Sequence, residues 1–241
     1  MRLLYAILLA MSLVAVGVAE DVALVQDSLQ AAINAGGTVY LKKGIYRQTV
    51  TIDRSVNIVG LGSGRTVVDG DGRGSVFTIG KANPNIDVKL SGMIIRGGKN
   101  DIVGGINNFG RLVVEDSTIT GNNAEFGGGI FNHNGTSTVT IDNVDIAGNS
   151  TTSDGAGIYN SVGKLIVNSG NITENVAEAT GGGIFNDFGN IIIKGGSIAR
   201  NTAKQTCGGV LSLGAMGLIG GSVVENVGGN IYVPNNPEFQ R

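Results

Sequence analysis

The sequence predicts an all-β protein, a solenoid of short parallel strands with about 26 residues in each coil. Three observations predict it. Valine and isoleucine together number 51 of the 241 residues, and these β-branched residues favour strands because their stiff side chains pack well on a pleated surface. The chain holds 41 glycines and three prolines, so glycine can form corners while little interrupts strand pairing. The sequence also repeats itself from about residue 86 to its end.

The composition excludes several classes of protein. Hydrophobic residues make up 41% of the chain, too many for an intrinsically disordered protein. Collagen is excluded because the glycines follow no three-residue period. With 17 basic and 19 acidic residues, the chain is close to neutral and has no basic stripe to neutralise the phosphates of a nucleic acid. We therefore expect one folded domain with no nucleic-acid partner.

Residues 1–19 are predicted to be a secretory signal peptide. Met1-Arg2 leads into an apolar run that ends in Gly17-Val18-Ala19, which gives a charged start, an apolar middle and a small-residue cleavage site. The alternative, a buried or membrane-spanning helix, is disfavoured because the run is shorter than the ~20 residues that cross a bilayer. We expect a secreted or cell-surface protein with no transmembrane anchor beyond the signal peptide. Cys207 has no second cysteine to pair with and is predicted to fill a small buried space.

Residues 20–37 are predicted to form an amphipathic helix that caps the solenoid. Apolar residues recur with helical spacing from Val22 to Ile33, and Gly36-Gly37 ends the pattern. The open end of a solenoid is an exposed strand edge, so a covering helix is physically expected there.

The solenoid itself is placed at residues 38–233. Its first strands are short apolar segments separated by glycine-rich turns. They are predicted at Val39–Leu41, Val50–Ile52, Val56–Val59, Thr66–Val68 and Val76–Ile79.

Two columns of asparagine run through the repeats that follow. In five successive segments an isoleucine or valine stands three residues before an asparagine, and these asparagines recur 27, 26, 26 and 25 residues apart. Equivalent residues of parallel coils lie one strand spacing apart, ~4.8 Å, so each column becomes a ladder. An asparagine at an inward corner tolerates left-handed backbone angles, and its amide can donate to and accept from its copies. The predicted structural ladders are Asn122, Asn149, Asn175, Asn201 and Asn226, and Asn108, Asn132, Asn160 and Asn186.

The C-terminal end lacks an obvious cap. Residues 234–241 are predicted to be a tail in which Pro234 and Pro237 oppose strand pairing. An uncovered last coil is an open strand edge, so edge-to-edge association with further copies of the chain is one expectation.

Several segments resemble right-handed, single-stranded parallel β-helix proteins. The stretches Ser28–Ile33, Val39–Tyr46, Val56–Gly60 and Val67–Gly70 are similar to the first coils of the pectin lyase-like superfamily. The later segments carry Gly-Gly-Gly-Ile or Gly-Ala-Gly-Ile and resemble repeats of polymorphic outer-membrane proteins and of adhesin-like surface proteins of bacteria and methanogenic archaea. The resemblance implies a right-handed β-helix. It implies little about activity, because many unrelated functions share this scaffold.

The catalytic motifs of that superfamily do not occur in the chain. Polygalacturonase-like members carry Gly-His-Gly and Arg-x-Lys, and neither string is present. The single histidine, His133, is predicted to be solvated. Glu115 and Asp142 align one strand spacing apart, which is compatible with retaining glycosidases, although two solvated corner carboxylates are the simpler interpretation. We therefore predict no metal and no cofactor, and only Glu115 and Asp142 are candidates if the chain is an enzyme.

The candidate binding surface is aromatic. If Ile130 and Asn132 face inward, Phe131 faces outward, and Tyr159 and Phe185 fall in its column. Stacked outward rings could present a flat platform to a sugar or to another protein. The alternative is that variable loops fold over the rings and bury them. Those loops are residues 123–126, 150–154 and 176–180.

These features lead to three expectations for function. The first is a secreted or cell-surface protein with a structural or adhesin-like role, which binds a polysaccharide or a surface protein through Phe131, Tyr159 and Phe185. The second is a carbohydrate-active enzyme, either a polysaccharide lyase or a glycoside hydrolase. The third is a subunit that stacks on its own copies to build a surface assembly.

Overall fold

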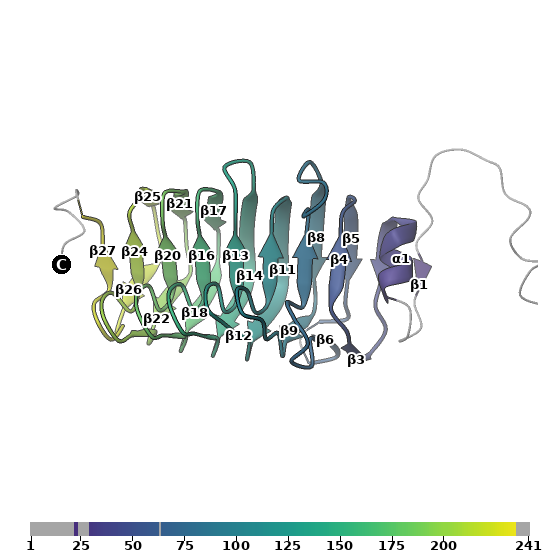
Figure 1. Cartoon of the computed structure of the whole chain (residues 1–241), viewed down its shortest axis with the longest axis horizontal. Coiled ribbons are helices and arrows are strands. Elements are labelled where there is room, and N and C mark those ends of the chain that lie inside the picture. The colour runs from purple at the N-terminus through teal and green to yellow at the C-terminus, as the bar shows by residue number, and fades with distance from the viewer. Residues whose placement is uncertain (1–21, 24–28, 63, 235–241) are drawn as a thin grey trace, which may run out of the picture.

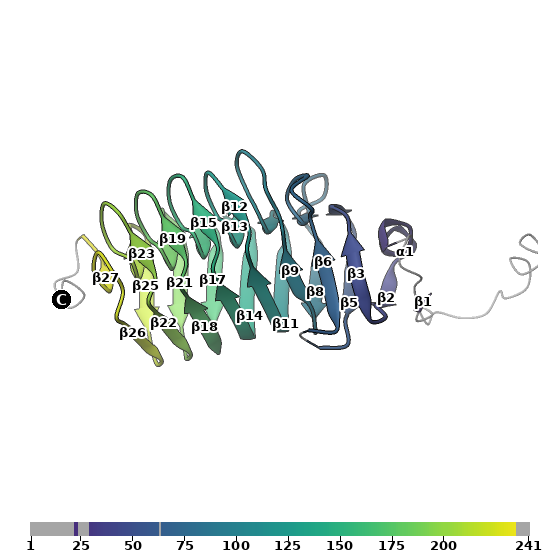
Figure 2. The same ribbon diagram turned by 90° about the horizontal axis from the view of Figure 1, so that it is seen from below.

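The computed structural model describes residues 22–23, 29–62 and 64–234. Within them the chain winds into an elongated parallel β-solenoid with about 26 residues in each turn, which Figures 1 and 2 show from two sides. The prediction of an all-β parallel solenoid is therefore confirmed. The predicted signal peptide, residues 1–19, and all of the predicted tail except Pro234 lie outside the described residues.

The N-terminal end carries a short strand and a short helix. β1 (Val22–Ala23) pairs in parallel with β2 (Gly37–Tyr40), so part of the helix predicted at 20–37 is strand instead. α1 (Leu29–Ala35) lies at this end and packs on the first coils (Figure 1). Its buried side chains are those of Leu29, Ala32 and Ile33. A cap over the whole end stays a prediction, since residues 24–28 lie outside the described part of the chain.

Three long faces and one short ladder form the wall of the solenoid, and every pair of neighbouring strands named below is parallel. The first face consists of β2, β5 (Val56–Val59), β8 (Asp87–Ser91), the first half of β11 (Arg111–Thr120), the first half of β14 (Thr138–Ala147), β17 (Lys164–Val167), β21 (Asn190–Ile193) and β25 (Ala215–Leu218). The second face consists of β3 (Gly44–Arg47), β6 (Thr66–Asp69), β9 (Ile94–Arg96), the second halves of β11 and β14, β18 (Gly170–Thr173), β22 (Ser197–Ala199) and β26 (Ser222–Val224).

The third face is a separate eight-stranded sheet. It consists of β4 (Val50–Ile52), β7 (Phe77–Ile79), β10 (Ile106–Asn108), β13 (Ile130–Asn132), β16 (Ile158–Asn160), β20 (Ile184–Asn186), β24 (Val210–Ser212) and β27 (Ile231–Tyr232). The short ladder consists of β12 (Asn123–Ala124), β15 (Ser150–Thr151), β19 (Val176–Ala177) and β23 (Thr202–Ala203).

The core runs along the axis of the solenoid as columns of equivalent side chains. Successive residues of a strand point to opposite sides, so every second residue enters the interior. One such column on the first face is Leu112, Val139, Leu165 and Ile191, which pair in register and are each at most 1% exposed. Full burial of one such side chain stabilises the fold by about 1.5–3 kcal/mol.

The asparagine columns form two hydrogen-bonded ladders inside this core. In the ladder between the second face and the short ladder, each Nδ2 donates to Oδ1 of the next asparagine over 2.9–3.0 Å, from Asn122 to Asn226. In the ladder at the end of the third face, the same bonds run from Asn108 to Asn186 over 2.6–2.9 Å and end on the hydroxyl of Ser212. Every bond from one ladder asparagine to the next points toward the C-terminal end, so the ladders have a direction.

Left-handed residues stand beside these asparagines. The expectation that the ladder asparagines themselves are left-handed is wrong, because none of them has a positive φ. In the first ladder the preceding residue makes the turn, and this turn aims the amide that follows it into the core. These residues are Gly121, Gly148, Glu174, Arg200 and Glu225, with φ between 56° and 65°. Three of the five corners thus carry a side chain where glycine would be less strained.

Candidate functional site

The third face presents a column of outward side chains in strict register. Asn107, Phe131, Tyr159, Phe185 and Leu211 pair one above the other from β10 to β24. They point outward because their neighbours on each strand, an isoleucine or valine and a ladder residue, are buried inside.

Five rings of this face stack into one continuous row. Phe131, Tyr159 and Phe185 come from the outward column just described. Phe109 and His133 come from a second column, whose residues directly follow the ladder asparagines. Ring centroids lie 4.0 Å apart for Phe109 and His133 and for His133 and Phe131, 4.6 Å apart for Phe131 and Tyr159, and 5.0 Å apart for Tyr159 and Phe185. We call Phe109, His133, Phe131, Tyr159 and Phe185 the aromatic row.

The aromatic row does not form the flat platform predicted from the sequence. Its members turn their faces toward one another, with interplanar angles of 10–42°, so the faces between neighbouring rings are closed to a ligand. Phe131 is 8% and Phe185 9% exposed, while Tyr159 is half-buried. Phe126, from the loop at 123–126, packs edge-on against Tyr159 at 5.4 Å. The alternative in which loops cover the column therefore describes these rings better.

His133 corrects a second expectation. It is half-buried between Phe109 and Phe131, although the sequence predicts a solvated side chain. Its Nε2 is buried and has no hydrogen-bond partner among the described residues. This burial lowers the pKa of His133 to about 4, so the imidazole is neutral at physiological pH. It acts in the row as a flat ring, like its phenylalanine neighbours.

Two carboxylates flank the middle of the aromatic row. Burial, together with the charges of Asp187 and Asp154, raises the pKa of Tyr159 to about 12. Burial and the charge of Asp154 also raise the pKa of Asp187. Asp154 is held in place by Thr180, whose N–H and hydroxyl donate to its Oδ1 over 3.0 and 2.6 Å. The rim of the row beside Tyr159 is therefore acidic.

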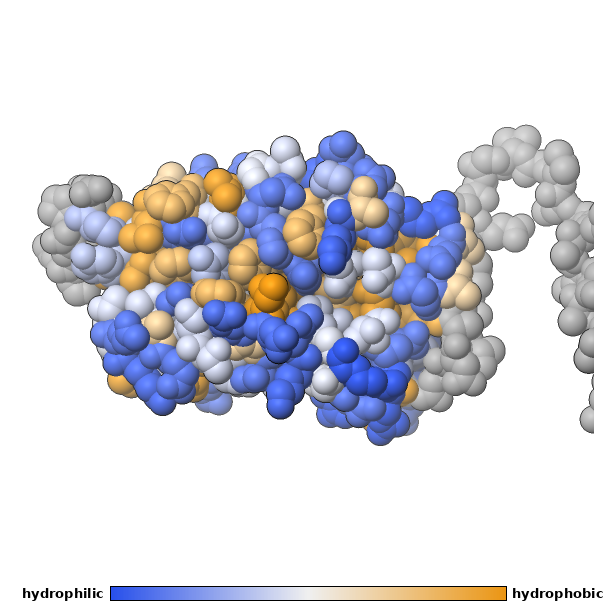
Figure 3. Space-filling model, viewed as in Figure 1, coloured by the Kyte–Doolittle hydropathy of each residue, from blue (hydrophilic) through white to orange (hydrophobic). Residues whose placement is uncertain are grey.

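Three large apolar side chains stand exposed on the corner after β16, β20 and β24. Val162 is 50%, Phe188 70% and Leu213 45% exposed. The N–H of Phe188 donates to Ser161 and that of Leu213 to Asn186, so these turns stack coil upon coil. We call the three side chains the apolar corner. Figure 3 shows apolar residues, in orange, along the C-terminal half of this side of the molecule, and exposed apolar groups that gather on a surface mark interaction sites.

Glu115 and Asp142 lie on the first face, apart from the aromatic row. They pair in register on β11 and β14 as their alignment predicts. Nζ of Lys89 lies 2.7 Å from Oε2 of Glu115, and the hydroxyl of Ser169 donates to Asp142 over 2.5 Å. Both side chains are at least partly exposed. They thus resemble surface carboxylates whose charge and lone pairs are already engaged.

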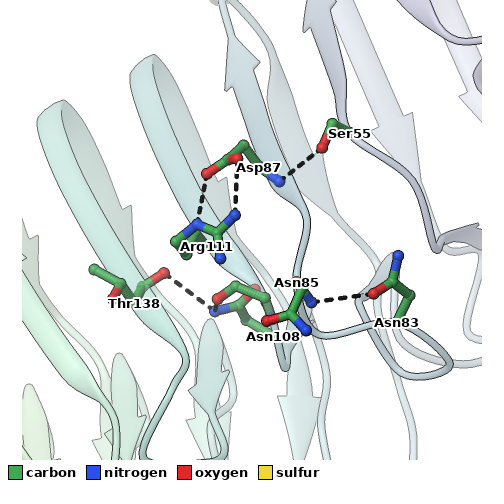
Figure 4. A network of polar contacts seen from close by, with 8 residues as sticks. Ser55, Asn83, Asn85, Asp87, Asn108, Arg111 and Thr138 are labelled. Atoms are coloured by element: carbon green, nitrogen blue, oxygen red, sulfur yellow. Dashed lines mark hydrogen bonds and ion pairs between the residues drawn. The ribbon is translucent and has the colours of Figure 1, made fainter.

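A shallow hollow of 190 Å³ also opens on the first face. Asp87 and Arg111, two of the residues that line it, are joined by two hydrogen bonds of 2.7 and 2.8 Å (Figure 4). The bond from Arg111 lowers the pKa of Asp87, and the N–H of Asp87 donates to Ser55. Asp87 and Arg111 neutralise each other, and Lys89, which also lines the hollow, is paired with Glu115, so the hollow offers a ligand less than the third face does.

Several side chains of the third face were not predicted from the sequence. Phe109 and the exposed Leu213 follow ladder positions directly, and the spacing of the ladder could have placed them in one column with His133 and Asp187. Phe126 and Asp154 sit in loops of unequal length, where counting residues gives no register.

Comparison with known proteins gives no match: no family model, no curated protein and no solved structure matches the chain. The parallel β-solenoid is shown by the fold, whereas the resemblance to the pectin lyase-like superfamily and to outer-membrane protein repeats stays an interpretation of the sequence. Among the described residues, no helix is long and apolar enough to span a membrane. In the same part of the chain, no three His, Cys, Asp or Glu side chains cluster as metal ligands would.

Proposed function

We propose that the chain is a secreted or cell-surface protein with an adhesin-like role, which holds a protein partner against the third face of its solenoid. The observation that carries the proposal is the apolar corner, where Val162, Phe188 and Leu213 are each 45–70% exposed on adjacent turns. Burial of such side chains at an interface supplies the anchors that protein binding depends on. The solenoid supports them as a rigid scaffold.

A protein suits this surface better than a polysaccharide does. Sugars bind best across several open aromatic faces, and in the aromatic row those faces are occupied by neighbouring rings. The exposed rings of Phe188 and Tyr232 do not belong to that row. The apolar corner instead offers rounded aliphatic and aromatic side chains to a complementary pocket. The carboxylates of Asp154 and Asp187 stand beside the row, so the fitting partner presents an apolar anchor with lysine or arginine next to it.

The second candidate, a carbohydrate-active enzyme that uses Glu115 and Asp142, gains no support from the described geometry. Glu115 is paired with Lys89 on the outside of the first face. A panel of polysaccharides incubated with the protein tests it. Turnover that disappears in Glu115→Gln would establish catalysis and overturn the adhesin-like proposal.

Beads coated with the protein test the adhesin-like proposal. We expect their retention on cells of the source organism to fall at least about tenfold when Val162, Phe188 and Leu213 are all replaced by serine. A matched control replaces three apolar residues that are exposed outside this corner, namely Leu61, Ile102 and Val176, and should keep retention.

Treatment of the cells before the beads are added shows whether the target is a protein or a glycan. Protease treatment should abolish bead retention, and periodate oxidation of surface sugars should leave it unchanged. Loss after periodate alone would point to a glycan instead. Equal loss in both triple variants would show that the apolar corner is not the contact.

A further inference from the structure

The last coil of the solenoid ends in open strand edges. β25, β26 and β27 each pair with one strand of the preceding coil, β21, β22 and β24, and with no further strand among the described residues. They lie together at the C-terminal end of the solenoid (Figure 1). An unpaired edge is a template for another strand.

The backbone of β25, the longest of the three, offers hydrogen bonds outward. The N–H groups of Ala215 and Ile219 donate back to Gly189 and Ile193 of the preceding coil. Because alternate residues of a strand bond to opposite sides, the N–H and C=O groups of Met216 and Leu218 point away from that coil. They form a short row of donors and acceptors on the open side.

The side chains of this coil leave the core unfinished. Met216, Leu218 and Val223 pack against the core cluster but are only partly buried. Their counterparts one coil earlier, Ile191, Ile193 and Ile198, are at most 2% exposed. Another layer of apolar side chains would complete the burial of all three.

Devices that normally protect a strand edge are scarce here. Natural edges carry lysine or proline within the strand, or are covered by a helix. Between residues 205 and 234 the one charged side chain is Glu225, and none of β25, β26 and β27 contains lysine or proline. Two such ends can therefore approach each other without strong electrostatic repulsion.

We propose that the C-terminal edge pairs with the same edge of a second copy, with β25 lying antiparallel to its counterpart across a two-fold axis. The N-terminal end differs from this edge, because α1 packs there against β2 and β4 and buries Leu29 and Ile33. Head-to-tail growth into a fibre is thereby disfavoured, and a closed tail-to-tail dimer satisfies both open edges at once. The two sets of Met216 and Leu218 side chains then join into one core.

Sedimentation equilibrium of the purified protein and of variants at Gly217 tests this dimer. A Cβ at Gly217 would meet nothing within 4 Å. A side chain at this position would point away from the core, because its neighbours Met216 and Leu218 pack against the core. We therefore expect Gly217→Lys to keep the fold. Two lysines then face each other near the two-fold axis, and we expect the dissociation constant to rise at least about tenfold. Gly217→Ala is the matched neutral control and should dimerise like the parent protein.

A mixture of two variants with opposite charges at Gly217 tests the dimer more sharply than either variant alone. Gly217→Lys and Gly217→Glu should each be monomeric alone and form a heterodimer together. Amide hydrogen exchange at Met216 and Leu218 should be fast in dilute protein and slow at high concentration.

Three results would overturn the proposal. One is a protein that stays monomeric with these amides fast at every concentration. Another is a monomer whose amides are always slow, which would mean that the chain covers its own edge. The third is a dimer that Gly217→Lys leaves intact. None of these results depends on the apolar corner, so the adhesin-like role is judged separately.

Discussion

The inside and the outside of the third face each carry a column of stacked side chains, but different interactions hold the two columns together. Inside, Asn108, Asn132, Asn160 and Asn186 are fully buried and hold each other by directional hydrogen bonds. Outside, the aromatic row stacks through ring contacts that lack strict direction. A missing asparagine leaves two neighbours unsatisfied, whereas a missing ring leaves a gap at the surface. Repetition in one register therefore gives a rigid polar spine and, one residue away, a surface that tolerates change.

Replacement of one interior asparagine should have the largest effect. Asn160→Ala removes the acceptor of Asn132 Nδ2 and the donor to Asn186 Oδ1, so we expect the free energy of unfolding to fall by about 3 kcal/mol. Urea denaturation measures it. The control is Asn226→Ala at the partly exposed end of the other ladder, which should cost about 1 kcal/mol. Equal losses would show that burial of the ladder is not the source of its importance.

Removal of an outer ring should cost less. Tyr159→Ala deletes contacts with Phe126, Phe131 and Phe185, but the side chain is only half-buried, so we expect a loss of about 1.5 kcal/mol. Tyr159→Phe keeps the ring and should stay within about 0.5 kcal/mol of the parent protein. The comparison between spine and surface fails if Tyr159→Ala is more damaging than Asn160→Ala in the same denaturation experiment.

The histidine of the row should give the protein a weak sensitivity to acid. The pKa of His133 is about 4 in the folded protein and ~6.5 in the unfolded chain. The unfolded chain therefore binds the proton first, and stability should fall as the pH drops from 6.5 to 4, by about 1–2 kcal/mol once partial solvent screening is allowed for.

The variant His133→Phe isolates this effect. It keeps a flat ring between Phe109 and Phe131 and removes the titrating group, so its advantage over the parent protein should grow as the pH falls through this window. Melting temperatures at pH 7, 5.5 and 4.5 measure it. A constant difference between the two proteins at all three pH values would contradict a neutral, buried imidazole.

The smallest effect is expected at the corners that precede the asparagines. Glu174 has φ 57°, where glycine is less strained, and its 3.7 Å contact with Arg200 is exposed and adds little. We expect Glu174→Gly to raise the free energy of unfolding by about 0.5–1 kcal/mol. Thr173→Gly, one residue earlier in β18, should lower it by a similar amount, as thermal unfolding of both variants would show. A loss of stability in Glu174→Gly would mean that its side chain has contacts worth more than the strain.

The register of the solenoid could be predicted from the sequence because the repeated motifs can be aligned with one another. Alignment of the repeated motifs places Phe131 on Tyr159, and Glu115 on Asp142, before any coordinate is known. The direction of side chains follows too, since a strand alternates its two sides. These features depend on the backbone alone.

The remaining features depend on how neighbouring side chains fill space. The faces of the rings are hidden because His133, from the adjacent column, inserts between Phe109 and Phe131, and no repeat pattern encodes that insertion. The left-handed position falls on Glu174 and not on Asn175, because the asparagine is needed inside the core as a hydrogen-bonding group. Phe126 reaches Tyr159 from a loop whose length varies between coils, so its contact has no counterpart in the other repeats.

The asparagine ladders allow the solenoid to change its length in fixed steps of one coil. Each coil bonds only to the coil before and the coil after it, and the 26 residues from Asn149 to Asn175 bring one rung of each ladder with them. Duplication of such a unit would add ~4.8 Å along the axis and leave every other rung in place. Gene duplication or deletion can therefore set how far the two ends of the protein stand apart, in steps of one strand, without inventing a new contact.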